Sequence, residues 1–134
     1  MRPLRVLETA LYASDLDAAE TFYTGVLGLE VIGRMEGRHV FFRCGDGVLL
    51  VFDPAATSAW RGSAPAHGAT GPGHMAFAAS GDDLEAWRTR LANAGVEIEA
   101  AVVWPNGSRS LYVRDPAGNS VEFAEPRLWG FGDG

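Results

Sequence analysis

The sequence predicts an α+β fold built from two βαβββ modules, and three observations carry that prediction. The stretches "ETALYASDLDAAETFYTGVLGLEV" (8–31) and "HMAFAASGDDLEAWRTRLANAGVEI" (74–98) share an apolar strand, an Ala-Ser pair, an Asp before Leu, a helix-like segment and a closing Gly before a second strand. Further along, "RHVFFR" parallels "RSLYVR", and "LLVFDP" parallels "VEFAEP". The length of 134 residues fits one domain with a sizeable core.

Each repeat reads as a strand, a helix and three further strands. We therefore predict a single domain, 1–134, in which curved mixed sheets surround a concave pocket and the helices cover the outer face. Its parts are module one (4–54), a linker (55–72), module two (73–126) and a C-terminal tail (127–134).

Module one is expected to begin with a strand over 4–12. Asp15 can cap the helix that follows, because its carboxylate can accept the free N–H groups of the first turn, and Gly28 is typical of a C-terminal cap. The predicted helix spans 16–27, with an apolar stripe of Leu16, Ala19, Phe22, Tyr23, Val26 and Leu27. Three strands follow, near 29–34, 38–43 and 47–52, with Gly-Asp-Gly turning the chain between the last two.

Module two repeats this order, beginning with a strand over 73–79. Asp82 or Asp83 is expected to cap a helix that turns Leu84, Trp87 and Leu91 inward and ends at Gly95. Strands are predicted near 96–103, 108–114 and 119–124. The stretch "DPAGN" before the last strand has the residues that a tight turn requires.

The segment between the modules, about 54–73, is rich in Ala, Gly, Ser and Pro and reads as a long loop. It fits a functional flap and a simple spacer equally well. Trp60 is its bulky side chain, and this ring either covers a ligand or rests on the protein itself. In the tail, Trp129 and Phe131 favour docking onto another surface, such as a second subunit.

Composition excludes several classes of function. All eleven basic residues are Arg without any basic cluster, and the net charge is −6, which argues against nucleic-acid binding. No apolar run is long enough for a membrane helix. Because Cys44 is the single cysteine, an intramolecular disulfide and a Cys-based zinc site are excluded. We expect a soluble, cytoplasmic protein with no nucleic-acid or membrane partner.

Strand alternation places Glu8, His74 and Glu122 on the face turned away from the helices. Glu8 and His74 also occupy the same position of the two repeats. Two carboxylates and an imidazole suit a divalent ion such as Fe, Mn, Ni, Co or Zn, and a metal would compensate the charge of a buried Glu122. The alternative is that both carboxylates line a solvated groove and His74 makes an ordinary hydrogen bond.

The segments "YASDLDAAETFYTGVLGLEV" and "LYVRDPAGNSVEF" carry a family resemblance. Over about 4–126 the chain resembles the vicinal oxygen chelate superfamily, which includes glyoxalase I, extradiol-type dioxygenases, methylmalonyl-CoA epimerase, fosfomycin-resistance enzymes and bleomycin-resistance binding proteins. The resemblance implies metal ligands on the first and last strands of each module, here Glu8, His74 and Glu122. The fourth position holds Leu50, which departs from the four ligands usual in glyoxalase I, and Glu8 replaces the His that ring-cleaving dioxygenases use. A homodimer, with modules paired within or across chains, is also implied.

The repeat alignment assigns further residues to the pocket face. The catalytic candidates are Glu8, Tyr12, His39 and Tyr112; the substrate-binding candidates are Phe41, Arg43, Trp60, Ser110 and Arg114. Ordinary surface roles are the competing interpretation for each arginine. The expected function is a metal-dependent lyase, isomerase or dioxygenase acting on a small oxygenated substrate through an enolate-like or oxyanionic intermediate. The alternative is a metal-free protein that sequesters a small molecule. His67, in the linker, is assigned no role.

Overall fold

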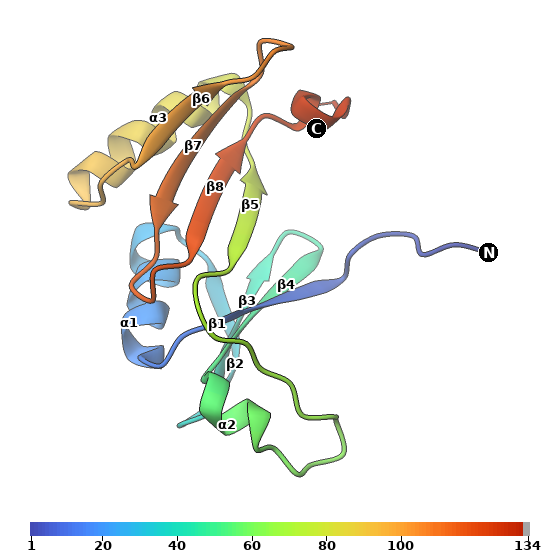
Figure 1. Cartoon of the computed structure of the whole chain (residues 1–134). Helices are drawn as coiled ribbons and strands as arrows, with labels where there is room; N and C mark the ends of the chain where they lie inside the picture. Colours follow the sequence, from blue (N-terminus) through green and yellow to red (C-terminus); the bar gives the residue numbers. More distant parts are fainter. Residues whose placement is uncertain (133–134) are drawn as a thin grey trace. The chain divides into compact units, whose positions relative to one another are not determined.

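The computed structural model describes residues 1–132 and confirms the two βαβββ modules (Figure 1). The chain divides into two compact units, residues 1–73 (unit 1) and residue 74 to the C-terminus (unit 2). Each unit contains a four-stranded mixed sheet with a helix packed on one face. None of the helices within residues 1–132 has the length and apolar character needed to cross a membrane.

Unit 1 has the strand order β1-β4-β3-β2, with β1 parallel to β4 and the other pairs antiparallel. Its elements are β1 (Glu8–Tyr12), α1 (Leu16–Glu20), the π-helical turn η1 (Thr21–Val26), β2 (Glu30–Met35), β3 (His39–Cys44), β4 (Gly47–Phe52) and α2 (Pro54–Ser58). The Asp15 carboxylate caps α1 by accepting the Ala18 N–H at 3.0 Å. One face of the sheet packs against the helical segment, where Tyr23 lies 5.4 Å from Phe42 between ring centroids.

Unit 2 repeats the order as β5-β8-β7-β6, with β5 parallel to β8. Its elements are β5 (His74–Ala78), α3 (Gly81–Asn93), β6 (Ala100–Val103), β7 (Arg109–Arg114), β8 (Ser120–Ala124) and the 3-10 turn η2 (Pro126–Trp129). Figure 1 shows α3 lying across one face of this sheet. The Phe123 ring contacts Phe77 of β5 and Trp87 of α3, with 5.7 and 4.6 Å between ring centroids. These contacts form part of the core between the sheet and α3.

The β1-β4-β3 strands of unit 1 and the β5-β8-β7 strands of unit 2 are paired in the same register. Leu50 pairs with Phe41 on one side and Ala10 on the other, while Glu122 pairs with Tyr112 and Ala76. The repeat therefore places Leu50 and Glu122 at equivalent points, as the sequence alignment predicts. Contacts between side chains place His74, Tyr112 and Glu122 on one face of the unit 2 sheet, and His39, Phe41 and Phe52 on one face of the unit 1 sheet.

Several predicted boundaries were wrong. β1 begins at Glu8, not at residue 4, and β6 covers only the last part of 96–103. Ser80, rather than Asp82 or Asp83, caps α3, since its hydroxyl accepts the Asp83 N–H at 3.1 Å. The predicted helix over 16–27 changes from α to π, because the Leu27 N–H bonds to the Phe22 carbonyl five residues back.

The linker expected to be a loop begins with a helix. Asp53 caps α2 by accepting the Ala56 N–H at 3.0 Å, and Pro54 occupies the first helical position. The β8 strand of unit 2 is likewise followed by Pro126 and a short helical turn, so this feature belongs to the repeat.

Candidate functional site

Glu122 is held on the open face of the unit 2 sheet by a chain of hydrogen bonds. The residue is only 6% exposed, and its Oε2 accepts the Ser110 hydroxyl at 2.6 Å. Trp104 Nε1 lies 2.9 Å from Ser110 Oγ. Because an indole nitrogen can only donate, Ser110 accepts from Trp104 and must turn its own hydrogen toward Glu122. Trp104 therefore fixes the direction in which Ser110 donates.

His74 faces the other oxygen of the same carboxylate. Its Nδ1 lies 3.1 Å from the Ser120 carbonyl oxygen, and since a carbonyl only accepts, Nδ1 carries the hydrogen. In the neutral imidazole Nε2 then presents a lone pair, and it lies 3.2 Å from Glu122 Oε1. Two electron-pair donors at this distance repel each other unless a proton or a cation lies between them.

Tyr112 completes this group of residues. Its ring is stacked on that of His74, at 6.2 Å between centroids and 20° between planes. Burial raises the pKa of the Tyr112 phenol, and the charge of Glu122 and a hydrogen bond to it raise that pKa further, while a hydrogen bond with Ser110 lowers it. The phenol is thus kept protonated and suits hydrogen-bond donation better than proton abstraction.

The donor atoms of His74 and Glu122 fit a divalent metal ion. Two ligand atoms bound to one ion at about 2.1 Å lie about 3.0–3.4 Å apart, and an Nδ1 hydrogen donated to a backbone carbonyl is typical of metal-binding histidines. Among residues 1–132 the structure brings no three His, Cys, Asp or Glu side chains together in a group that could hold a metal ion, so Glu8 is not grouped with His74 and Glu122.

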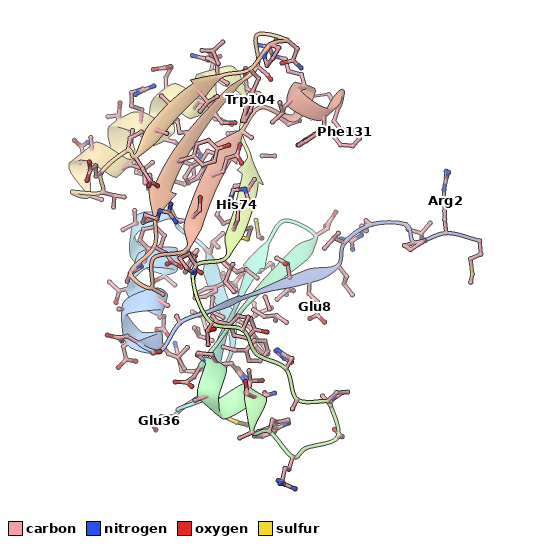
Figure 2. The ribbon with its side chains drawn as sticks, viewed as in Figure 1. Arg2, Glu8, Glu36, His74, Trp104 and Phe131 are labelled. Atoms are coloured by element: carbon pink, nitrogen blue, oxygen red, sulfur yellow. The ribbon has the colours of Figure 1, made fainter. Side chains whose placement is uncertain are left out.

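Glu8, the candidate third ligand, begins β1 of unit 1 and is exposed (Figure 2). Figure 2 also labels His74, which begins β5 of unit 2. The two residues stand at the same register of the two sheets, opposite Val48 and Ser120. The equivalence predicted from the repeat is therefore retained in the strand pairing.

The two candidate substrate-binding arginines differ in their partners. Arg114 makes a two-point ion pair with Glu99, at 2.8 and 3.2 Å, and also donates to the Gly118 carbonyl. Arg43 is exposed and lies 4.0 Å from Glu30. An ion pair between exposed groups is weak, so Arg43 is the more available of the two.

The open face of unit 1 is aromatic where that of unit 2 is polar. His39 stacks on Phe41 at 3.9 Å with 8° between planes, and Phe52 meets both rings edge-on. The Arg38 guanidinium donates to His39 Nδ1 at 2.9 Å, which leaves the hydrogen of the neutral ring on Nε2. Burial lowers the pKa of His39, and the Arg38 charge lowers it further.

Two contacts made by the linker were missed from the sequence. His67 forms a 2.7 Å hydrogen bond through Nδ1 with the Tyr12 hydroxyl, and its ring meets Phe52 at 4.5 Å. The Trp60 ring lies 4.0 Å from the guanidinium carbon of Arg38. Trp60 thus rests on its own unit. The sequence analysis did not single out Arg38, although the match of Arg38 to Arg109 in the repeat was a signal available in the sequence.

Comparison with known proteins identifies relatives over most of the chain. The model of the Glyoxalase/Bleomycin resistance protein/Dioxygenase superfamily matches residues 5–123. The chain is similar to lactoylglutathione lyase from Agrobacterium tumefaciens, with 48% identity and a TM-score of 0.95 over 98% of this chain and 100% of that one. It is also similar in fold to a glyoxalase/bleomycin resistance protein/dioxygenase from Nocardioides, at 23% identity and a TM-score of 0.74, covering 93% and 85% of the two chains. No curated protein matches the chain in sequence.

Proposed function

Because the chain belongs to the glyoxalase/bleomycin resistance protein/dioxygenase superfamily, we propose that it is a divalent-metal-dependent enzyme acting on a small oxygenated substrate. The observation that carries the proposal is the facing pair of His74 Nε2 and Glu122 Oε1 at 3.2 Å, with Nδ1 held by the Ser120 carbonyl. The similarity to a lactoylglutathione lyase favours a lyase or isomerase outcome over oxygen chemistry.

In this proposal Glu8, His74 and Glu122 hold the metal, which is Fe, Mn, Ni, Co or Zn. Leu50 stands at the position equivalent to Glu122 and offers no donor atom, so the proposed site has three protein ligands. This departs from the four ligands that the family resemblance implies for glyoxalase I, and it leaves the identity of the substrate open.

The metal, when bound, supplies Lewis acidity toward two adjacent substrate oxygens. Glu8 is the proposed proton carrier, since it is the exposed carboxylate of the set and, within residues 1–132, has no hydrogen-bonded neighbour comparable to Ser110. Neutral His39 and protonated Tyr112 are proposed to donate hydrogen bonds to developing negative charge on the substrate. Tyr12, Phe41, Arg43 and Ser110 complete the proposed pocket lining.

Metal binding is tested directly by elemental analysis and melting temperature. Pure protein should hold up to one divalent ion per chain, and one of the five candidate metals should raise the melting temperature, because binding to the native state stabilises it. Glu122→Gln should weaken metal binding by more than about 100-fold with the fold intact. The matched variant Glu97→Gln neutralises an exposed carboxylate of the same unit and should retain the metal. Absence of bound metal together with no melting shift for any of the five ions would refute the proposal.

A homodimer is part of the proposal, and mixing experiments test whether ligands come from one chain or two. Glu8→Gln and Glu122→Gln should each lose the metal alone. If the site is shared between chains, co-refolding equal amounts of the two variants should restore about a quarter of the metal content, because about half of the dimers are mixed and each mixed dimer contains one intact site of two. If each site belongs to one chain, the mixture should remain empty. A monomeric mass by light scattering would contradict the dimer.

A small-molecule binding protein is the second candidate function. It is favoured by the aromatic face of unit 1, where His39, Phe41 and Phe52 form a continuous set of rings. Ligand binding that survives metal removal and the Glu122→Gln change would favour this function over the metalloenzyme.

A further inference from the structure

We propose that Arg38 in unit 1 binds the carboxylate of an anionic small molecule, in a subsite separate from the metal ligands. The first observation is an unmet hydrogen-bonding need. Arg38 Nε is closed to water and has no hydrogen-bond partner among residues 1–132. Most buried donors in native proteins are paired, so such an atom marks a site that an external partner completes.

The repeated fold provides an internal reference for this arginine. Arg38 and Arg109 occupy equivalent positions, since Asp53 N–H bonds to the Arg38 carbonyl as Glu125 N–H bonds to that of Arg109. Arg109 has two carboxylate partners, Glu85 at 2.9 Å and Glu125 at 3.9 Å. The same strand position thus holds a neutralised guanidinium in unit 2.

In unit 1 the residue equivalent to Glu125 is Asp53, and its carboxylate is not paired with Arg38. Asp53 accepts the Ala56 N–H and caps α2. Within the described part of the chain, Arg38 forms no ion pair, and its one side-chain hydrogen bond goes to the neutral ring of His39. A half-buried positive charge without a negative partner is costly, and an arriving anion would offset that cost.

The surroundings of Arg38 favour a planar oxyanion. The guanidinium carbon of Arg38 lies over the rings of Trp60 and Phe52, 4.0 and 5.2 Å from their centroids. The donors of a guanidinium lie in its plane, and because Nη1 is hydrogen-bonded to His39, the edge formed by Nε and Nη2 is the one left for an acceptor. A carboxylate matches that edge with two parallel hydrogen bonds.

Trp60 links binding to a measurable signal. Any side chain on Gly62 would collide with the Trp60 indole, so the linker fits closely around this ring. Because Arg38 Nε is closed to water, an anion reaches it only if neighbouring groups shift, and the Trp60 ring, 4.0 Å from the guanidinium carbon, is one of these neighbours. Anion binding should therefore change the fluorescence of Trp60.

The test uses the full chain, stripped of metal with a chelating resin because soluble chelators are themselves carboxylates. Acetate and succinate are titrated in Tris-chloride at constant ionic strength, with inorganic phosphate as a second oxyanion. Wild-type protein should show a saturable fluorescence change with the carboxylates. Trp60→Phe should abolish the optical signal while calorimetry still detects binding.

Arg38→Gln should weaken carboxylate binding by about tenfold or more, as expected for the loss of a charge-assisted hydrogen-bonded pair. Arg38→Lys keeps the charge but not the two-point edge, and should also weaken binding. Arg88→Gln removes an exposed positive charge from unit 2 and should bind like wild type. Far-UV circular dichroism checks that each variant is folded.

The proposal is overturned if wild-type protein shows no saturable response, or if Arg38→Gln and Arg38→Lys both bind as tightly as Arg88→Gln. A response to phosphate without one to acetate or succinate would overturn the carboxylate assignment. Since the protein is metal-free throughout, the outcome is independent of whether Glu8, His74 and Glu122 hold a metal.

Discussion

In unit 1, Leu50 pairs with Phe41 and Ala10 across the sheet; in unit 2, the residue at the same register is Glu122, between Tyr112 and Ala76. The surrounding residues change with it, since Ser110 in unit 2 corresponds to His39 in unit 1. One sheet therefore carries a hydrogen-bonded carboxylate and the other a set of stacked rings. The comparison teaches that a duplicated backbone can keep its helix-facing core while its open faces acquire different chemistry.

The shared part of the two units is the core, and its removal should have the largest effect. Phe42→Ala in unit 1 and Phe123→Ala in unit 2 should each lower the free energy of unfolding by about 3–5 kcal/mol, because both rings are almost fully buried. Denaturant unfolding measures the loss. Val103→Ala, at an exposed position, should change stability by less than about 0.5 kcal/mol.

The same experiment shows whether the units unfold together. A single transition that both variants shift would mean that the units share one cooperative unfolding event. Two transitions, each shifted by one variant, would mean that the repeat units are independently stable. A loss under about 1 kcal/mol for either variant would contradict the packing seen around Tyr23 or Trp87.

Placing the Glu122 carboxylate at the equivalent position of unit 1 should destabilise the protein, but by less than removal of a core ring. Leu50→Glu introduces a carboxylate beside Phe41 without the equivalent of Ser110, and should destabilise the protein by about 1–3 kcal/mol at neutral pH. The electrostatic part of this cost should decrease as the pH falls through the raised folded-state pKa of the new carboxyl group, and it should be absent below about pH 4, where the group is neutral in the unfolded chain as well. Leu50→Gln has nearly the same shape without the charge and isolates the electrostatic part. Equal stability of Leu50→Glu and wild type would show that the aromatic face tolerates charge.

The hydrogen bonds that orient Glu122 in unit 2 can be weakened without removing a proposed metal ligand. Trp104→Phe removes the indole donor to Ser110 but keeps an aromatic ring, and should weaken metal binding by about tenfold, because Ser110 is then less firmly oriented toward Glu122. Metal titration followed by calorimetry measures the change. Trp129→Phe, at an exposed ring, is the matched control. Unchanged affinity in both Trp104→Phe and Ser110→Ala would remove this hydrogen-bond chain from the proposed function.

The structural features that could be predicted from the sequence are those marked by a periodic pattern of residues. Strand alternation has a period of two and a buried face to fix its register, so the order of residues alone is enough to assign Glu122 and His74 to one face. The repeat then assigned Leu50 to the position in module one that is equivalent to Glu122 in module two. Boundaries were less predictable because Ser80 and Asp82 are both good helix caps, and the choice depends on where the chain leaves β5.

The linker contacts were not predictable in the same way. The stretch from 54 to 73 has no apolar period, so nothing in it indicates that His67 returns to Tyr12 or that Trp60 lies over Arg38. These contacts depend on how a long segment folds back onto the sheet. The start of α2 was readable from Asp53 and Pro54, a cap followed by proline, but the richness in Ala, Gly and Ser concealed it.

The smallest expected effect is a pH dependence that belongs to unit 1. The pKa of His39 is lowered in the folded protein, so the unfolded chain binds a proton at His39 more readily. The stability associated with a neutral His39 should be fully present above the ordinary histidine pKa of about 6.5 and should decrease as the pH falls from there toward the folded-state value. The matching residue of unit 2 is Ser110, which does not titrate.

His39→Gln should therefore flatten the stability profile between about pH 5 and 8, measured by denaturant unfolding at several pH values. Arg38→Gln should flatten it partly, because the Arg38 charge is the lesser cause of the shift and burial, the greater one, is retained. Ser110→Ala should alter stability by a similar amount at every pH in this range. A wild-type slope that survives His39→Gln would assign the pH dependence to groups outside the aromatic face, and the contrast between the two sheets would then lie in shape and polarity rather than in titration.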